Sequence, residues 1–338
     1  MKIDDNSSDD AHDDHLSDLL KKMDLQEPSD QFVDQVIQVY ALQKGHPRFR
    51  LLKAPLFLMG GLGLALLLPL IVSLAGIIRD NPTPRLLIRH DTDISEYRKI
   101  ASQPQFDCVG RYASSEESED YAVGVLIAKD WVLTASHFVE DSSVWFFGGE
   151  YYRTQKIFRH PTLDLLPDDR PAQWDGVDLA LIKLDRNVKG VRPAVLYQGE
   201  AEEGMIITKI GYGYAGDGLA GLNSPRSQER LGGQNTIDLV GGEINGIDLS
   251  ANVLVCDFDN PQSDTLNLLG SPVPLPLEIG GSKGDSGGGV FFCDTDTCQL
   301  VGIVSGALNR QIKYGSLMAF ARVSTARLWI EKVVSSAP

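Results

Sequence analysis

A serine flanked by glycines is the residue of this chain best suited to covalent chemistry. Ser286 lies in the run Gly284-Asp285-Ser286-Gly287-Gly288, just before the apolar residues 290–292. A serine hydroxyl is a poor nucleophile that needs a nearby base and backbone amides to bind the oxyanion it generates. Glycines permit the tight turn and the close approach of a substrate carbonyl. Most glycine-rich turns are only turns, so the rest of the chain must supply the base and the acid.

A histidine and an aspartate meet this requirement, each at the end of an apolar run. His137 closes residues 131–137, and Asp178 heads the alternating residues 178–184. His160 is the competing base, but it follows a strand in a turn-like context. Asp164 and Asp175 compete with Asp178, but neither heads an apolar strand that would bury a carboxylate beside an imidazole. The order His137, Asp178, Ser286 therefore predicts a catalytic triad.

The three motifs resemble those of the trypsin/chymotrypsin-like serine proteases, which read Thr-Ala-Ala-His, Asp-Ile-Ala-Leu and Gly-Asp-Ser-Gly-Gly. This chain has Thr-Ala-Ser-His ending at His137, Asp-Leu-Ala-Leu starting at Asp178, and the full serine motif. The resemblance implies a serine endopeptidase that forms an acyl-enzyme. Ser286 would be the nucleophile, His137 the general base and then acid, and Asp178 the group that orients the imidazole. The N–H groups of Gly284 and Ser286 would form the oxyanion hole.

The same resemblance implies an all-β fold for residues 88–338, with two six-stranded antiparallel barrels and a C-terminal helix. Short alternating runs broken by turn residues fit this fold. A helix is predicted over 324–334, with Leu328 and Val333 facing inward. The Gly- and Ser-rich residues 217–234 are expected to form a mobile surface loop.

The resemblance also indicates how a substrate would be held. It places Gly280 at the floor of the primary pocket, and an uncharged floor favours cleavage after uncharged residues. Glu278 would enter the pocket only if the loop were shifted. Ser305 and Gly306 match the substrate-binding edge of the family, with Ser305 near the triad aspartate.

Activation is a further expectation of the resemblance. In many members, proteolysis frees an α-amino group that pairs with the aspartate just before the nucleophile. Here Ile88 would be the new terminus and Asp285 its partner, although the usual Ile-Val-Gly-Gly sequence is absent.

The composition limits the partners of this chain. The formal net charge of −15 argues against nucleic acid, because phosphate binding needs clustered Lys and Arg. No cofactor is expected. Nine aspartates lie within residues 1–30, which favours a solvated, disordered tail over an acidic docking tail. Helical patterns over 16–23 and 32–40 either pack together or bind a cytoplasmic partner.

An uncharged apolar segment divides the chain. Residues 54–78 carry no charged side chain, and such a helix is long enough to cross a hydrocarbon core of about 30 Å. A cleaved signal peptide is the alternative, with a small-residue site at 73–75, but its positive region would begin far from the N-terminus. We therefore expect an acidic region over 1–53, a transmembrane helix over 54–78, a linker over 79–87 and a protease domain over 88–338.

The cysteines and the family resemblance predict the orientation of this membrane protein. Flanking Lys and Arg are nearly balanced, with a slight excess before the helix. All four cysteines follow the apolar segment, which indicates an oxidising compartment for the C-terminal domain. We therefore expect a cytoplasmic N-terminus and a protease domain that is periplasmic or extracellular.

The pairing of the cysteines is partly open. Cys293 and Cys298 join two strand-like runs, so a disulfide across this hairpin is reasonable, and Cys108 with Cys256 is then the remaining pair. Four free buried thiols are the alternative, because a sequence does not fix connectivity. No metal site is expected, since no CxxC pair or histidine cluster accompanies the cysteines.

Two other functional classes compete with the peptidase. One is a catalytically silent binding or sensor module on the same fold, and the other is a signalling receptor whose N-terminal helices bind a partner. The complete set of triad residues favours the enzyme, which would act on a protein or peptide substrate.

Overall fold

The computed structural model describes residues 87–115, 121–224, 229–295, 297–309 and 312–336. The predicted acidic region, its helices, the transmembrane helix 54–78 and almost the whole linker lie outside these residues. Within the described residues, no helix has both the length and the apolar character needed to cross a membrane. The fold below is therefore that of the predicted protease domain.

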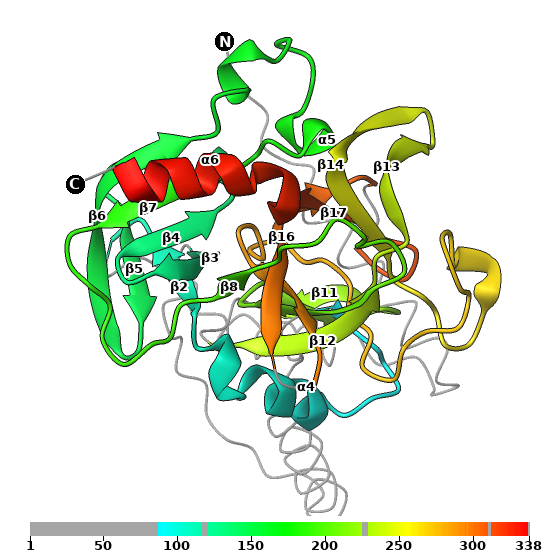
Figure 1. The fold of residues 1–338 in the computed structure, drawn as a ribbon. Coiled ribbons are helices and arrows are strands. Elements are labelled where there is room, and N and C mark those ends of the chain that lie inside the picture. The colour runs from blue at the N-terminus through cyan, green and yellow to red at the C-terminus, as the bar shows by residue number, and fades with distance from the viewer. Residues whose placement is uncertain (1–86, 116–120, 225–228, 296, 310–311, 337–338) are drawn as a thin grey trace, which may run out of the picture. The chain divides into compact units, whose positions relative to one another are not determined.

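The first half of the described chain forms a closed antiparallel barrel of six strands, which we call the first barrel (Figure 1). Its strand order is β2-β3-β4-β7-β6-β5. Leu133 and Leu181 oppose each other across β4 and β7 and are fully buried, as the alternating apolar pattern predicts. All five residues of β2 are buried, so this strand does not alternate between buried and exposed positions. The strands are β2 (Val109–Ala113), β3 (Tyr121–Ala128), β4 (Trp131–Thr134), β5 (Val144–Phe147), β6 (Glu150–Arg159) and β7 (Ala180–Leu184).

The second half forms an eight-stranded sheet, which we call the second sheet. Its path is β12-β9-β15-β16-β17-β14-β13, and β8 pairs with β16. Apolar residues from β9, β14, β15, β16 and β17 meet in its interior. The strands are β8 (Val195–Leu196), β9 (Ile206–Gly211), β12 (Leu231–Thr236), β13 (Leu239–Ile244), β14 (Ile247–Asp257), β15 (Gly289–Cys293), β16 (Cys298–Ala307) and β17 (Leu317–Arg322).

The prediction of a second closed six-stranded barrel is wrong. Among the described strands, β12 and β13 end the path and form no ladder with each other. The backbone of Gln234 in β12 instead donates to Leu277 and accepts from Ile279. Residues 277–279 thus occupy the edge of β12 at which such a barrel would close.

Residues 217–234 also differ from the prediction of a mobile loop. They contribute to β10 (Ala215–Asp217), β11 (Gly221–Ser224) and β12. β10 pairs with β11 and with β1 (Leu87–Ile88), which forms a small third sheet. Gly232 and Gly233 fit here because side chains at these positions would collide with Ile210 and Ile279. The glycines of this segment therefore allow close packing of β12 against its neighbours. The prediction of a loop considered only that the segment is polar and rich in glycine.

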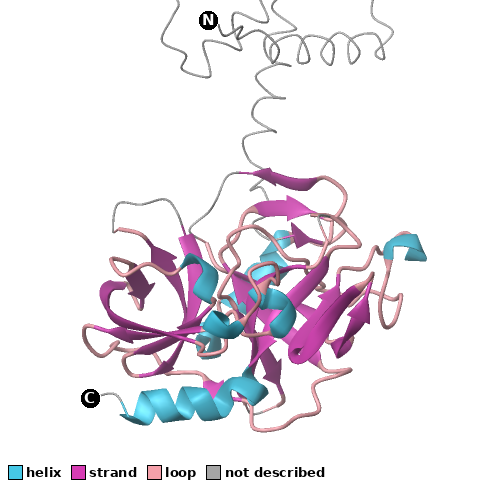
Figure 2. Ribbon diagram, turned by 90° about the horizontal axis from the view of Figure 1, so that it is seen from above, coloured by secondary structure: helices cyan, strands magenta, loops and turns pink. Residues whose placement is uncertain are grey.

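The helices are short except for the last one. The predicted C-terminal helix is present as α6 (Val323–Ser336), and Figure 2 shows it along one side of the strands. Ala326 and Ile330 are buried, but Leu328 is 76% exposed, so its predicted inward position is wrong. Val333 packs against the main core. The other helical segments are α4 (Ile94–Ala101), α5 (Ala172–Asp175) and the 3₁₀ turns Pro104–Phe106, Ser136–Phe138, Leu163–Leu165 and Asp264–Leu266.

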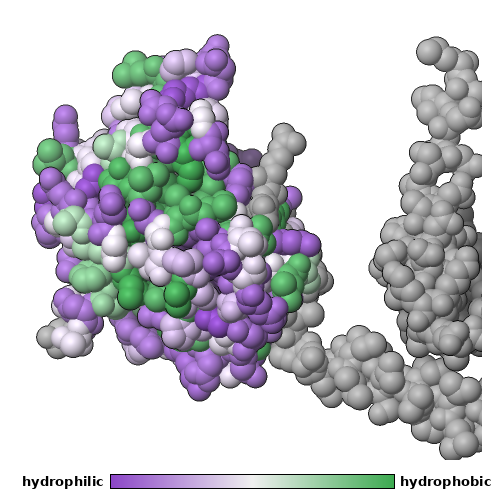
Figure 3. Space-filling view, turned by 90° about the vertical axis from the view of Figure 1, so that its right-hand side faces the viewer, coloured by the Kyte–Doolittle hydropathy of each residue, from purple (hydrophilic) through white to green (hydrophobic). Residues whose placement is uncertain are grey.

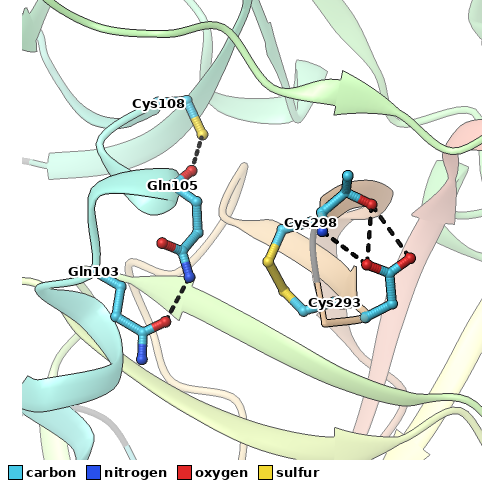
Figure 4. Close-up of a disulfide and its surroundings, with 7 residues drawn as sticks. Gln103, Gln105, Cys108, Cys293 and Cys298 are labelled. Carbon is cyan, nitrogen blue, oxygen red and sulfur yellow. Dashed lines mark hydrogen bonds between the residues drawn. A yellow bond between two sulfur atoms is a disulfide. The ribbon is translucent and has the colours of Figure 1, made fainter.

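One of the two predicted disulfides is present. Cys293 and Cys298 are bonded across the β15–β16 hairpin (Figure 4). Cys108 and Cys256 are free and buried, which corrects their predicted pairing. They lie in separate apolar clusters, Cys108 with residues of the first barrel and Cys256 within the second sheet, whereas a disulfide needs adjacent Cα atoms. Burial raises the pKa of the Cys108 thiol to about 12, so it stays protonated.

Apolar side chains also reach the surface. Figure 3 shows them gathered on the face that carries β13, with polar side chains around them. The segment between β14 and the nucleophile turn contributes three exposed apolar residues, Leu266, Leu268 and Val273. This segment contains the 3₁₀ turn Asp264–Leu266, and it ends at residues 277–279, which cover the edge of β12.

Candidate active site

The structure brings three distant residues into one hydrogen-bonded row. The Nδ1 atom of His137 lies 2.7 Å from Oδ2 of Asp178, and its Nε2 atom lies 3.0 Å from Oγ of Ser286. His137 is in the 3₁₀ turn after β4, and Asp178 is just before β7, so both come from the first barrel. Ser286 precedes β15 of the second sheet. The row therefore spans the two halves of the fold.

The aspartate of this row is fixed by four hydrogen bonds. Its Oδ1 atom accepts from the N–H groups of Ser136 and His137, at 2.9 and 3.0 Å. Its Oδ2 atom accepts from the imidazole and, at 2.6 Å, from Oγ of Ser305. Burial raises the pKa of Asp178, but the hydrogen bonds from His137 and Ser305 outweigh burial and leave this pKa below its usual value. The carboxylate therefore stays charged, and the hydrogen bond that it accepts from the imidazole keeps the proton on Nδ1.

Access differs along the row. The His137 side chain is 45% exposed, whereas that of Asp178 is 3% exposed. A substrate can reach the imidazole and the serine hydroxyl, while the carboxylate acts from behind the ring. This arrangement allows proton transfer at Nε2 and holds the opposite nitrogen, Nδ1, in its protonated form.

The nucleophile turn is held from both halves of the fold. The carbonyl of Ser286 accepts from the N–H of Val123 in β3, at 2.9 Å, and the N–H of Gly287 donates to Val304. Gly287 has φ +81°, and a Cβ atom there would lie 1.9 Å from the carbonyl oxygen of Val123. Only glycine fits this position, because a side chain would force the barrel and the sheet apart.

Two backbone amides of the turn are available to a ligand. Within the described residues, neither the N–H of Gly284 nor that of Ser286 donates a hydrogen bond, although Asp285 and Gly287 both do so. Gly284 has φ +91°, which a glycine adopts without strain. These are the two amides that the family resemblance assigns to an oxyanion hole.

The aspartate before the nucleophile has a different partner from the one expected. Oδ2 of Asp285 lies 2.6 Å from Nζ of Lys209, and neither side chain is exposed. Ile88 is not its partner, because Ile88 is buried in β1, where its carbonyl accepts from Gly218. In the uncleaved chain, Asp285 is therefore paired with Lys209 and not with Ile88.

Gly280, which the family resemblance places at the floor of the primary pocket, is packed against apolar groups. A Cβ atom at Gly280 would lie 2.7 Å from the Phe258 ring and 3.1 Å from Cβ of Leu87. The carbonyl of Gly280 accepts from Lys209. Glu278 does not enter this space, because its two carboxyl oxygens accept from the N–H groups of Asp259 and Leu275.

The expected substrate edge is an unpaired strand edge beside the nucleophile. β15 pairs with β16 only as far as Gly289 opposite Ile303, and no other described strand continues along that edge. Ser305 and Gly306 follow, and Ser305 bonds to Asp178. A Cβ atom at Gly306 would lie 3.7 Å from Cδ of Gln173, which comes from α5. An extended peptide has the geometry to add to this edge.

The competing acid and base candidates lie elsewhere. His160 packs edge-on against Trp329 of α6, and burial lowers its pKa. Asp175 forms an ion pair with Arg170, and Asp164 lies in the 3₁₀ turn Leu163–Leu165. The structure therefore assembles the favoured residues and separates their competitors.

Sequence reasoning missed two polar residues that support the site. Lys209 interrupts the apolar run Ile206-Ile207-Thr208-Lys209-Ile210, and a charge within such a run is a signal that could have revealed it. Thr134 is fully buried, and its Oγ1 atom donates to the carbonyl of Val123 at 2.6 Å. Thr134 has no comparable signal, because threonine is ordinary in a strand. Among the described residues, no group of acidic, histidine or cysteine side chains could hold a metal ion.

Comparisons with known proteins support a trypsin-like fold. The trypsin family model matches residues 99–236, a range that contains His137 and Asp178. Many solved chains match, among them mouse neuropsin, a serine protease expressed in the limbic system of the brain. That likeness has a TM-score of 0.50 at 18% identity and covers 69% of this chain and 95% of neuropsin, which supports the fold. No curated protein matches the chain.

The match to the trypsin family model and the mostly β, chymotrypsin-like fold support a serine-type endopeptidase. Residues 99–236 of this chain match the trypsin family model, and the described domain has the fold of the trypsin/chymotrypsin-like serine proteases.

Proposed function

We propose that the chain hydrolyses peptide bonds through a triad of Ser286, His137 and Asp178. The observation that carries this proposal is the hydrogen-bonded row from Asp178 Oδ2 to Ser286 Oγ. Nε2 of His137 takes the proton of Ser286 as Oγ attacks the substrate carbonyl carbon. Asp178 holds the proton on Nδ1 and stabilises the imidazolium that forms.

The remaining steps use the same groups. The N–H groups of Gly284 and Ser286 bind the negative oxygen of the tetrahedral intermediate. The intermediate collapses as His137 gives its proton to the leaving amine, which yields an acyl-enzyme on Ser286. A water molecule, deprotonated by His137, then attacks the ester, and the acid product leaves with the serine hydroxyl restored.

The substrate is a protein or peptide in extended form, added to the β16 edge at Ser305 and Gly306. The apolar surroundings of Gly280 and the engaged carboxylate of Glu278 favour an uncharged residue before the cleaved bond. A peptide library profiled for its cleavage sites tests this preference. Strong selection for Arg or Lys would contradict it.

We also propose that the enzyme is anchored to a membrane by residues 54–78, with the protease domain outside the cytoplasm. The uninterrupted apolar sequence of this segment supports the anchor, and the disulfide between Cys293 and Cys298 agrees with an oxidising compartment. The N-terminal helical patterns would then face a cytoplasmic partner. Protease protection of tagged termini in sealed vesicles tests the orientation.

Replacement of the nucleophile tests the catalytic proposal most directly. Ser286→Ala should lower kcat by several orders of magnitude, on the order of 10⁶, because no other group can form the acyl-enzyme. Labelling by a fluorophosphonate should disappear with it. Ser335→Ala, on α6, is the matched control and should retain both activities.

The outcomes separate the two functional classes. Labelling that depends on Ser286 and turnover that is lost in Ser286→Ala support the peptidase. A folded wild-type protein with neither labelling nor turnover would instead indicate the catalytically silent module.

A further inference from the structure

A buried ion pair lies directly behind the nucleophile turn. Lys209 and Asp285 are both completely excluded from solvent, with 2.6 Å between Nζ and Oδ2. Asp285 stands between Gly284 and Ser286, the two residues whose N–H groups have no partner among the described residues. Its side chain contacts Lys209 of β9 and the N–H of Gly213, and is fully buried. The orientation of Asp285 therefore sets the direction of the two amides that flank it.

Every oxygen of the Asp285 carboxylate is engaged. Oδ1 accepts from the N–H of Gly213 at 2.9 Å, and Oδ2 accepts from that of Ser282 at 3.1 Å in addition to Lys209. Nζ of Lys209 also donates to the carbonyl of Gly280 at 3.0 Å. The ammonium thus binds both ends of residues 280–285, the segment that contains Gly284 and ends just before Ser286.

The ammonium comes from a strand of the second sheet. Lys209 is in β9, where it pairs with Gly233 of β12 on one side and with Val290 of β15 on the other. Both neighbours fix the backbone of Lys209 as soon as the sheet forms. The cation is therefore supplied by folding, with no newly freed terminus.

The segment around Ile88 has another role in this fold. Ile88 pairs with Asp217 of β10 and with Ile279, and the carbonyl of Leu87 accepts from the N–H of Gly280 at 2.8 Å. The uncleaved peptide continues through β1 as part of the small sheet. Cleavage between Leu87 and Ile88 would remove support from residues 279 and 280, which lie on the segment that Lys209 organises.

We propose that Lys209 is a positioning residue that holds the oxyanion hole in its active form in the uncleaved chain. A buried carboxylate without a cation is strongly disfavoured, so Asp285 would turn toward solvent if Lys209 were lost, and the flanking amides would rotate with it. The peptidase is accordingly competent without proteolytic activation. This inference rests on the proposed function, and it concerns regulation of the same site.

The first test removes the ammonium and keeps the length of the side chain. Lys209→Met in the full chain should lower kcat by about 10²–10³-fold, the loss that follows removal of an oxyanion-hole donor, with little change in KM. Affinity for a peptide aldehyde, which forms an oxyanion on Ser286, should fall in parallel with kcat. A merely structural role would leave the kcat of the folded fraction unchanged.

Lys183→Met is the matched control. It breaks the Lys183–Asp130 pair on β7 of the first barrel and should leave kcat, KM and aldehyde affinity unchanged. If Lys209→Met does not fold, the double variant Lys209→Met/Asp285→Asn is measured instead. It removes both buried charges, so we expect it to fold. The double variant should be folded but still impaired in kcat. Wild-type kcat in either variant would overturn the inference.

The second test asks whether the intact chain is active. The full chain is treated with a fluorophosphonate and its mass and N-terminal sequence are determined. Label on chains that retain the Leu87–Ile88 bond supports the inference, and label confined to chains cleaved at that bond overturns it. A different outcome would contradict the proposed function itself. In that case the wild-type protein would neither hydrolyse substrate nor react with the fluorophosphonate, whether intact or cleaved.

Discussion

The two halves of the protease domain stabilise their interiors in different ways. The first barrel is closed and its buried residues are mainly apolar. Among its described residues, Arg111 and Asp178 are the buried charged groups. The second sheet is open and buries many more, namely Glu202, Lys209, Asp257, Asp259, Glu278, Asp285 and Arg322. The barrel thus relies on apolar packing, whereas the sheet also relies on paired and shared charges.

This difference explains how the site is divided. The barrel contributes the imidazole and the carboxylate, which need a rigid frame of strands around them. The sheet contributes the nucleophile turn, whose amides must be aimed by charge and hydrogen bonds. Removing buried charges should therefore have different consequences in the two halves.

The largest effect is expected for the buried carboxylate of the first barrel. Asp178→Asn should lower kcat by about 10⁴-fold, because an amide at this position favours the wrong imidazole tautomer, while the fold is kept. Steady-state kinetics and a thermal unfolding curve measure the two quantities. Asp130→Asn, on the turn between β3 and β4, is the control. If Asp178→Asn kept the wild-type activity, the first barrel would not contribute a catalytic carboxylate.

A smaller but still large effect is expected for an ion pair of the second sheet. Arg322 binds both carboxyl oxygens of Glu202, at 2.9 and 2.7 Å, and Glu202 is fully buried. Arg322→Met should lower the free energy of unfolding by about 3–5 kcal/mol, because it leaves a buried charge unpaired. Denaturant unfolding provides the value.

The matched change in the first barrel is Arg186→Met. Arg186 is 46% exposed, and its pairs with Asp185 and Glu150 are at the surface. The expected loss is within about 1 kcal/mol. Equal losses of unfolding free energy in Arg322→Met and Arg186→Met would contradict the view that only the second sheet relies on buried charge pairs.

A weaker effect than that of Arg322→Met is expected for carboxyl groups that lie close together in the second sheet. Burial and the neighbouring carboxylates Asp257, Glu278 and Asp238 raise the pKa of Asp259 to about 8. Burial is also the main cause that raises the pKa values of Glu278 and Asp238 to about 7. The folded protein therefore holds protons that the unfolded chain releases near pH 4.

Stability should accordingly fall as the pH rises from about 4 to about 8, because the folded state binds more protons than the unfolded state over this window. Asp259→Asn should flatten this dependence and stabilise the protein at pH 8 by roughly 1–3 kcal/mol. Unfolding curves from pH 4 to pH 9 measure the change. A wild-type stability that rises over this window would contradict the buried, protonated state of these groups.

The sequence was most informative where function or alternation leaves a local pattern. The boundaries of β4, β5 and β17 follow directly from short apolar runs, and the motifs around His137, Asp178 and Ser286 identified the row that the fold assembles. β12 escaped prediction because its glycines make room for Ile210 and Ile279, which are distant in sequence. Leu328 was misplaced because the side of α6 that faces the core depends on how the helix docks.

The sequence by itself determined the candidate reacting groups, their order along the chain and the mostly β class of fold, because these properties depend on residue type and local spacing. The tertiary structure decided which charges meet. It paired Asp285 with Lys209, left Cys108 and Cys256 apart, and covered the edge of β12 with residues 277–279. Such pairings depend on long-range packing, since residues dozens of positions apart meet only after the sheet has formed.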